Sequence, residues 1–185
     1  IEAYFDNGQL KLKGQFKDGI EDGFFKFYHE NGQLEGEGNF NLGVKNGLFV
    51  MYDKDGKLTG QQSYKNDIKD GLFEHYYDNG NLKLKKIYKN GNINGSSEVY
   101  YENGQLERIE NYKDGLKHGF YRLYRPDGVL YSQGSFKEGE PHGLFEYFHK
   151  NGNLEEKGYY KDGLRRGIWE TFNIDGLKIK IENRN

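Results

Sequence analysis

The side chains that could carry acid–base or metal chemistry recur at one fixed spacing along this sequence. His118 and His142 are 24 residues apart. A column of glutamates keeps the same step, at Glu74, Glu98, Glu146 and Glu170. Equivalent residues in neighbouring β-hairpins lie about 10 Å apart, which is too far for two backbone-fixed imidazoles to bind one metal ion directly. We therefore predict no metal site and no cofactor, and we expect the glutamates to form a solvated ladder facing lysines.

No other pattern in the sequence indicates catalysis. Serine nucleophile motifs and phosphate-binding loops are absent, because the glycines follow the repeat spacing and not a phosphate-binding geometry. The chain contains no cysteine, so it has neither a disulfide framework nor a thiolate metal site. We predict that the protein has no catalytic residues and is not an enzyme.

The common spacing belongs to a repeat that runs through all 185 residues. Each repeat contains an Asn-Gly or Asp-Gly pair, beginning at Asn7, Asn31, Asp55, Asn79, Asn103, Asp127, Asn151 and Asp175. One aromatic column keeps the same period, at Tyr4, Tyr28, Tyr52, Tyr76, Tyr100, Tyr124, Phe148 and Phe172. The pattern predicts one continuous array of about seven to eight repeats over residues 1–185.

Each repeat is predicted to be a β-hairpin. The runs on either side of the Asn/Asp-Gly pair are too short for helices and lack a helical period. In "RPDGVL", Pro126 suits the first position of a three-residue loop, a type I turn followed by a glycine bulge. The "KDGLKHG" stretch, Lys113 to Gly119, is predicted to be the loop that leads to the next hairpin. The expected fold is all-β, an elongated single-layer antiparallel meander that is twisted or superhelical.

The register of the hairpin predicts which face is buried. A three-residue loop places Tyr28 opposite Leu34, and we expect Phe24 opposite Gly38. The even-numbered apolar columns then share one face, which we predict to be the core, and the odd-numbered face is predicted to be more exposed. A glycine column, at Gly14, Gly38, Gly134 and Gly158, would let aromatic rings lie flat over the backbone.

Two odd-numbered columns vary between repeats, and we predict that they carry the binding specificity. Columns that stay constant build the scaffold, whereas variable positions are free to contact a partner. The predicted partner-binding residues are Phe27, His29, His75, Tyr77, Tyr101, Leu123, Arg125, Tyr147 and His149. The "NGNINGSSEVYY" stretch, Asn90 to Tyr101, departs from the pattern, either as a soft hinge or as repeat drift without function.

Composition excludes some partners. The formal net charge is −2, with no basic cluster, so neither nucleic acid nor anionic lipid is indicated as a partner. There is no apolar run long enough to cross a membrane as a helix. The chain begins at Ile1 in mid-repeat, which indicates a processed protein or an excised piece, and both a cytoplasmic and an exported location are compatible with the sequence. Open edge strands would allow end-to-end self-association.

The unit "NGQLEGEGNFNLGVKNGLFVMY" resembles the MORN-variant repeat, a relative of the membrane occupation and recognition nexus repeat. The resemblance rests on the "NG-x-L" turn, the "Y/F-K-D/N-G" step and the glycine before an aromatic strand, and it covers essentially the whole chain. It implies a binding scaffold of the YwqK-like antitoxin type, with neutralisation of a toxin as one role.

Two function classes follow from the sequence. The first is a non-catalytic scaffold that binds a protein partner, with a toxin as one candidate. The alternative is a cell-surface or cell-wall repeat module that binds glycans on stacked aromatic rings. Glycan-binding hairpin repeats depend on tryptophan, and this chain has only Trp169, which favours the protein-binding scaffold.

Overall fold

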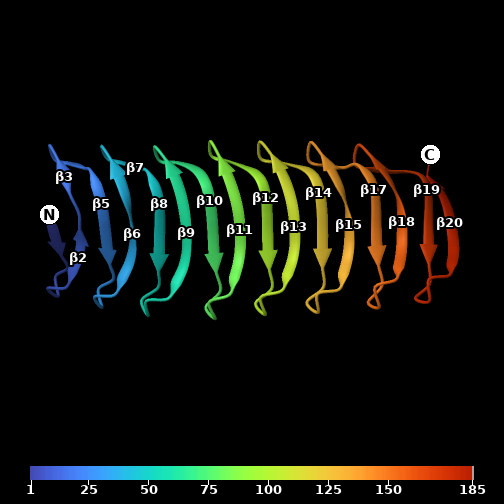
Figure 1. The fold of residues 1–185 in the computed structure, drawn as a ribbon, viewed down its shortest axis with the longest axis horizontal. Coiled ribbons are helices and arrows are strands. Elements are labelled where there is room, and N and C mark those ends of the chain that lie inside the picture. The colour runs from blue at the N-terminus through green and yellow to red at the C-terminus, as the bar shows by residue number, and fades with distance from the viewer. Residues whose placement is uncertain (185) are drawn as a thin grey trace. The chain divides into compact units, whose positions relative to one another are not determined.

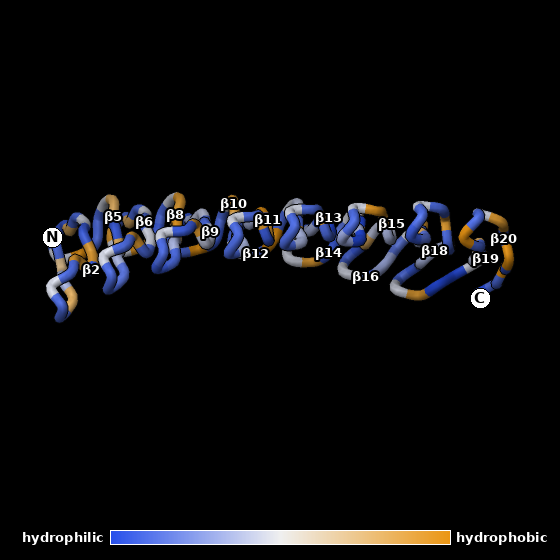
Figure 2. The backbone as a smooth tube through the Cα atoms, turned by 90° about the horizontal axis from the view of Figure 1, so that it is seen from below, coloured by the Kyte–Doolittle hydropathy of each residue, from blue (hydrophilic) through white to orange (hydrophobic). Residues whose placement is uncertain are grey.

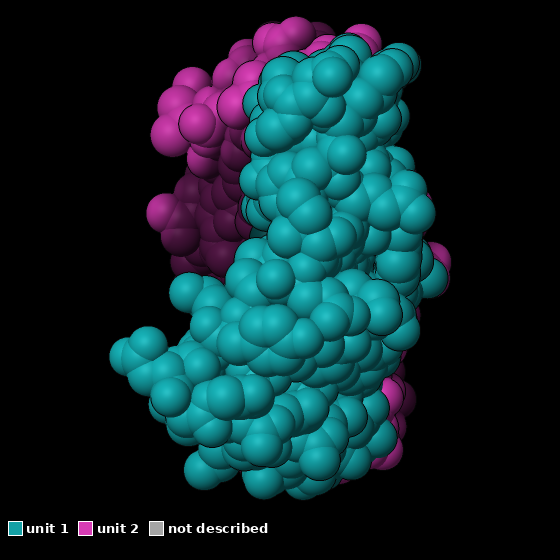
Figure 3. Space-filling model, turned by 90° about the vertical axis from the view of Figure 1, so that its left-hand side faces the viewer, with its two compact units in different colours: residues 1–92 teal, residues 93–185 magenta. Residues whose placement is uncertain are grey.

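The computed structural model describes residues 1–184 and contains two compact units. Unit 1 is Ile1–Asn92 and unit 2 is Ile93–Asn185, coloured separately in Figure 3. Within each unit, consecutive antiparallel strands follow one another in chain order (Figure 1). The predicted all-β meander of 24-residue hairpins is confirmed in both units. The boundary between the units falls inside the irregular Asn90–Tyr101 stretch.

The strands are short, as the sequence runs predicted. Unit 1 contains β1 (Glu2–Tyr4), β2 (Leu10–Lys13), β3 (Phe16–Lys17), β4 (Ile20–Glu21), β5 (Gly23–Tyr28), β6 (Leu34–Asn41), β7 (Val44–Lys45), β8 (Gly47–Tyr52), β9 (Leu58–Lys65), β10 (Ile68–Tyr76) and β11 (Leu82–Lys89). Unit 2 contains β12 (Asn92–Tyr100), β13 (Leu106–Lys113), β14 (Leu116–Tyr124), β15 (Leu130–Lys137), β16 (Glu140–Pro141), β17 (Gly143–Phe148), β18 (Leu154–Lys161), β19 (Leu164–Phe172) and β20 (Lys178–Arg184). The first residue of β12, Asn92, belongs to unit 1.

The Asn/Asp-Gly pairs form three-residue loops, as predicted. In the loop between β5 and β6, the Gly32 N–H donates to the His29 carbonyl at 2.8 Å, and the His29 N–H donates to the Gln33 carbonyl at 2.8 Å. Gly32 has a φ of 86°, which is the left-handed position that closes a type I turn with a glycine bulge. The asparagines also join neighbouring loops, since Asn31 Nδ2 donates to the Lys54 carbonyl at 2.7 Å.

The connection between successive hairpins is shorter than the sequence suggested. The Lys113–Gly119 stretch was expected to be a loop, but only Asp114 and Gly115 form the turn, with φ values of 51° and 86°. Positive φ at both central residues is a two-residue type I′ turn, whose twist matches that of the strands. The strand β14 resumes at Leu116, and Gly119, with a φ of 99°, accommodates a bulge within it.

One of these turns places leucine where the backbone favours asparagine or glycine. Leu42 has a φ of 48° and its side chain is exposed. A left-handed conformation costs an ordinary residue about 1–2 kcal/mol, and asparagine tolerates it better. We expect Leu42→Asn to raise the free energy of unfolding by about 1 kcal/mol, measured by urea denaturation. Leu164→Asn, an equally exposed leucine outside the left-handed region, is the control that should not gain stability.

The predicted face assignment is wrong by one residue on one strand. Gly38 lies opposite Phe25, not Phe24, and the register shifts between Phe27 and Tyr28 while Tyr28 still faces Leu34. The shift is a β-bulge in which Glu35 is the extra residue, and one extra residue exchanges the two faces of the strand beyond it. Phe25, Phe27 and Phe40 therefore share one face. We call this surface, with the equivalent residues of other repeats, the aromatic face.

The buried residues lie on the aromatic face. The buried apolar side chains are Phe25, Phe49, Phe145 and Trp169, with exposed fractions between 1% and 8%. The even-numbered column that was expected to form the core is instead exposed on the opposite face, for example Phe24 at 51% and Ile168 at 60%. Figure 2 shows the resulting alternation of apolar and polar stretches along the chain in each unit.

Candidate binding surface

Edge-to-face aromatic contacts build the aromatic face of unit 1. Phe25 and Phe40 are 5.1 Å apart between ring centroids, Phe40 and Phe49 are 5.3 Å apart, and Phe49 and Tyr64 are 5.4 Å apart. All three pairs are T-shaped, an arrangement that aromatic quadrupoles favour. Because each pair joins two neighbouring strands, the row of rings links successive hairpins into one surface.

Unit 2 repeats this construction with more varied rings. The centroids are 5.7 Å apart for Phe136 and Phe145, 4.9 Å for Phe145 and Tyr160, and 5.2 Å for Tyr160 and Trp169.

The predicted role of the glycine column is confirmed in both units. A Cβ added at Gly14, Gly38, Gly134 or Gly158 would lie 2.2–2.6 Å from the ring above it. The four rings concerned are the buried ones.

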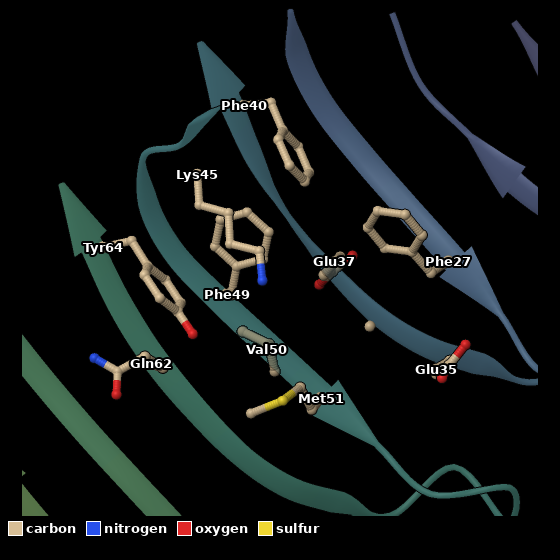
Figure 4. A pocket seen from close by; sticks show the side chains of 11 residues that line it. Phe27, Glu35, Glu37, Phe40, Lys45, Phe49, Val50, Met51, Gln62 and Tyr64 are labelled. Atoms are coloured by element: carbon tan, nitrogen blue, oxygen red, sulfur yellow. The ribbon is translucent and has the colours of Figure 1, made fainter. Parts of the chain in front are cut away.

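The aromatic face of unit 1 contains a groove of about 270 Å³. Figure 4 shows its lining, which includes Glu35 at one end and the side chains of Phe27, Phe40, Lys45, Phe49, Met51, Gln62 and Tyr64. The Lys45 ammonium group lies 5.2 Å from the Phe49 ring centroid and 5.1 Å from that of Tyr64. Gln62 is fully buried, and its Oε1 has no hydrogen-bond partner among the described residues. The groove therefore has largely apolar walls, with the Lys45 ammonium group held above two rings.

A second groove, of about 460 Å³, lies on the aromatic face of unit 2. Its floor contains the buried Glu110, whose carboxylate is 2.7 Å from Lys117 Nζ and accepts a 2.9 Å hydrogen bond from the Tyr112 hydroxyl. Burial, reinforced by this bond to Glu110, raises the pKa of Tyr112 to about 12. The charges in this groove are therefore satisfied within the chain.

The structure brings one of the two predicted binding columns to these grooves. Phe27 lines the groove of unit 1, and Leu123 and Tyr147 line that of unit 2. His75 occupies the equivalent position in another repeat and is exposed. These four residues are accessible on the aromatic face, and their role in binding stays a prediction.

The second predicted column makes hydrogen bonds within the chain. The Tyr101 hydroxyl donates to the Tyr124 carbonyl at 2.8 Å, and Arg125 Nη2 donates to the Phe148 carbonyl at 2.8 Å. His29 Nε2 and His149 Nε2 lie 3.1 and 2.9 Å from the carbonyl oxygens 23 residues further on. The Lys83 ammonium group lies 5.2 Å from the ring centroid of Tyr77. These residues vary in type, yet four of them each make a side-chain hydrogen bond to a backbone carbonyl of the next hairpin.

This shared role gives a direct test on Tyr101. We expect Tyr101→Phe to lower the free energy of unfolding by about 1 kcal/mol, because it leaves the Tyr124 carbonyl without its donor. The matched control is Tyr131→Phe, since Tyr131 is exposed and its contacts with Tyr147 and Arg125 are made by its ring. Equal denaturation midpoints for wild type and Tyr101→Phe would contradict the structural role.

The glutamate column lies on the opposite face, where two of its four members face lysines as predicted, whereas Glu98 accepts a hydrogen bond from Tyr100 and Glu146 accepts one from Gln133. Glu74 lies 3.8 Å from Lys85, and Glu170 lies 3.3 Å from Lys157. Of the two histidines considered above as metal ligands, His142 has its Nδ1 3.8 Å from Asp162. Across residues 1–184, no group of three or more histidines, aspartates or glutamates is placed to hold a metal ion. The same residues form no helix long and apolar enough to span a membrane.

Lys45 and Lys69 were not singled out from the sequence. Both lie on the aromatic face of unit 1, and Lys69 Nζ is 5.4 Å from the Phe73 ring centroid and 5.1 Å from that of Tyr88. A signal was available, because Lys45, Lys69, Lys117 and Arg165 recur at one position of the repeat.

Serial hairpins, a glycine under each buried ring and an aromatic face with open grooves define a β-hairpin repeat protein. A family model described as the MORN repeat variant matches residues 1–18, 21–42, 45–66, 69–90, 93–114 and 141–162, more than half of the chain. The chain belongs to the MORN repeat variant family. No curated protein matches it.

Proposed function

We propose that this chain is a non-catalytic scaffold that binds a protein partner through its aromatic face, and that it neutralises a toxin by this binding. The observation that carries the proposal is the pair of open grooves on the aromatic face. Each lies where one repeat position varies, as Phe27 and Met51 in unit 1 and as Leu123 and Tyr147 in unit 2.

The chemistry of these grooves suits a protein interface. Aromatic residues, methionine and arginine are enriched at interfaces because they provide contact area at low entropic cost. Glycan stacking has less support, because the single tryptophan, Trp169, is 1% exposed and the Arg165 guanidinium covers its ring at 3.8 Å from the centroid. A sugar could not reach that ring face without displacing Arg165.

The proposal is tested by capture of partners from the source organism's lysate and culture medium with the purified chain, read by mass spectrometry. We expect one protein at near-equal stoichiometry. It should be lost with Met51→Ser and Leu123→Ser combined, and retained with the opposite-face pair Leu48→Ser and Phe120→Ser. Met51 and Leu48 are matched, with exposed fractions of 41% and 46%.

Neutralisation needs its own measurement. Expression of the captured partner alone should arrest growth, and co-expression of wild-type chain should restore it, whereas the Met51→Ser, Leu123→Ser variant should not. Failure to capture any protein would reject the scaffold proposal. A captured partner that does not impair growth would be consistent with the scaffold proposal and would reject the proposal that the partner is a toxin.

A further inference from the structure

The two units differ in how they satisfy the cations of the aromatic face. In unit 2, Lys117 lies 2.7 Å from Glu110, and Arg165 makes a bidentate ion pair with Glu156 at 3.0 and 2.8 Å. The equivalent residues of unit 1 are Lys45 and Lys69, whose ammonium groups lie over aromatic rings. No carboxylate of residues 1–184 lies within 4.0 Å of either ammonium group, although the Lys45 backbone N–H donates to Asp67 Oδ1 at 2.8 Å.

From this difference we propose that Lys45 and Lys69 form an anion-binding pair that docks an acidic, apolar segment of a partner protein on unit 1. The inference rests on the proposed scaffold function and names the chemistry of its partner. Each lysine is held between rings of two neighbouring strands, so its ammonium group is already positioned for a carboxylate.

The groove beside Lys45 specifies what accompanies the carboxylate. Its volume of about 270 Å³ is below the range of about 300–1,000 Å³ of small-molecule sites, and it suits one or two apolar side chains. Phe27, Phe40 and Met51 supply the apolar walls. An apolar side chain in the groove with a carboxylate beside it would satisfy both features.

One acidic side chain of the groove gives the occupant a direction. The Glu37 side chain turns instead to the opposite face, where its carboxylate lies 3.4 Å from Lys26 Nζ. Glu35, the exposed bulge residue, stands at the far end of the groove from Lys45 in Figure 4. The partner's carboxylate is therefore expected at the Lys45 end of the groove.

The spacing of the two lysines sets the spacing of the acids. Lys45 and Lys69 occupy equivalent positions in neighbouring repeats, about 10 Å apart from two strand spacings. A segment in the polyproline II conformation has three residues per turn and rises about 3.1 Å per residue, so carboxylates three residues apart point the same way and lie about 9 Å apart. The segment that fits has an acid, two apolar residues and a second acid.

The test is fluorescence anisotropy with the full chain and labelled peptides of about eight residues. The probe carries two glutamates three positions apart with Leu-Phe between them. One comparison peptide replaces the glutamates with lysines, and another replaces Leu-Phe with Ser-Ser. Only the acidic, apolar probe is expected to bind, with an affinity that falls as salt rises.

Variants of the chain locate the binding site. Lys45→Gln and Lys69→Gln should each weaken binding about tenfold, the loss of about one charge-assisted hydrogen bond. Lys45→Arg keeps the charge and should retain affinity within about threefold. Lys26→Gln, the same change on the opposite face of unit 1, should leave the affinity unchanged.

Several results would overturn the inference. The acidic, apolar probe could fail to bind, or the lysine peptide could bind as tightly as that probe. Lys26→Gln could weaken binding as much as Lys45→Gln does. Phosphatidylserine vesicles could bind in place of the peptide, in a way that depends on Lys45 and Lys69. If the captured partner binds the Lys45→Gln, Lys69→Gln variant normally, this site is rejected while the scaffold function stands. If no protein is captured at all, the scaffold function itself is rejected.

Discussion

Phe25→Ala is expected to lower the free energy of unfolding by about 3–5 kcal/mol, whereas Phe24→Ala should cost less than about 1 kcal/mol. The two phenylalanines are neighbours in β5 and differ mainly in the face they occupy. Phe25 is 1% exposed and makes T-shaped contacts with Phe16 and Phe40 at 5.3 and 5.1 Å, whereas Phe24 is 51% exposed. Chemical denaturation of the two variants at one protein concentration measures the difference.

The pair forms a matched experiment because the same atoms are removed one residue apart. The Phe25 ring bridges neighbouring strands, so its removal leaves a cavity between them. In a repeat array, stability depends on such contacts between neighbouring repeats. A larger loss for Phe24→Ala than for Phe25→Ala would restore the face assignment expected from the sequence and contradict the bulge at Glu35.

The hairpins could be predicted from sequence because turn chemistry is local. An Asn-Gly pair needs only its own backbone to favour a left-handed glycine, as Gly32 shows with its φ of 86°. The 24-residue period then repeats the same evidence, so several independent columns agree on where the strands begin and end. The three-residue loop and the pairing of Tyr28 with Leu34 followed from these local signals.

The buried face could not be predicted in the same way, because it depends on a single inserted residue. Glu35 has no sequence signature that marks it as a bulge, yet it shifts the phase of every later residue in β6 by one. Phe40 therefore joins Phe25 on the aromatic face, although the sequence had indicated opposite faces for these two residues. Apolar columns on both faces of the hairpin removed the hydrophobic contrast that usually fixes register.

The candidate site was predictable only in part, for a related reason. Variation at a repeat position indicated freedom to bind a partner, and Phe27 and Tyr147 do line grooves. Tyr101 and Arg125 vary in type but keep one donor that reaches a backbone carbonyl. Variation in residue type thus concealed a constant physical role. The unpaired Lys45 became evident only when its carboxylate-paired counterpart Lys117 could be compared with it.

Gly38→Ala is expected to lower the free energy of unfolding by about 1–3 kcal/mol in the wild-type chain. The added Cβ would lie 2.4 Å from Cδ1 of Phe49, and the ring must move because it is held against Phe40 and Tyr64 at 5.3 and 5.4 Å. Glycine is an unfavourable residue in a strand, so ordinary strand propensity would give the opposite sign. Thermal and urea unfolding both report the change.

A double-mutant cycle separates the steric cause from propensity. Phe49→Ala alone should cost about 3–5 kcal/mol, and in that background Gly38→Ala should become neutral or stabilising because no ring lies over the new methyl group. The chain contains a natural precedent one repeat further on, where Gln62 replaces the glycine and is fully buried beside Phe73, whose ring is less buried than that of Phe49. If Gly38→Ala costs the same in both backgrounds, the ring does not depend on bare backbone. A sign change between backgrounds would establish that Gly38 is retained for the Phe49 ring that lies over it.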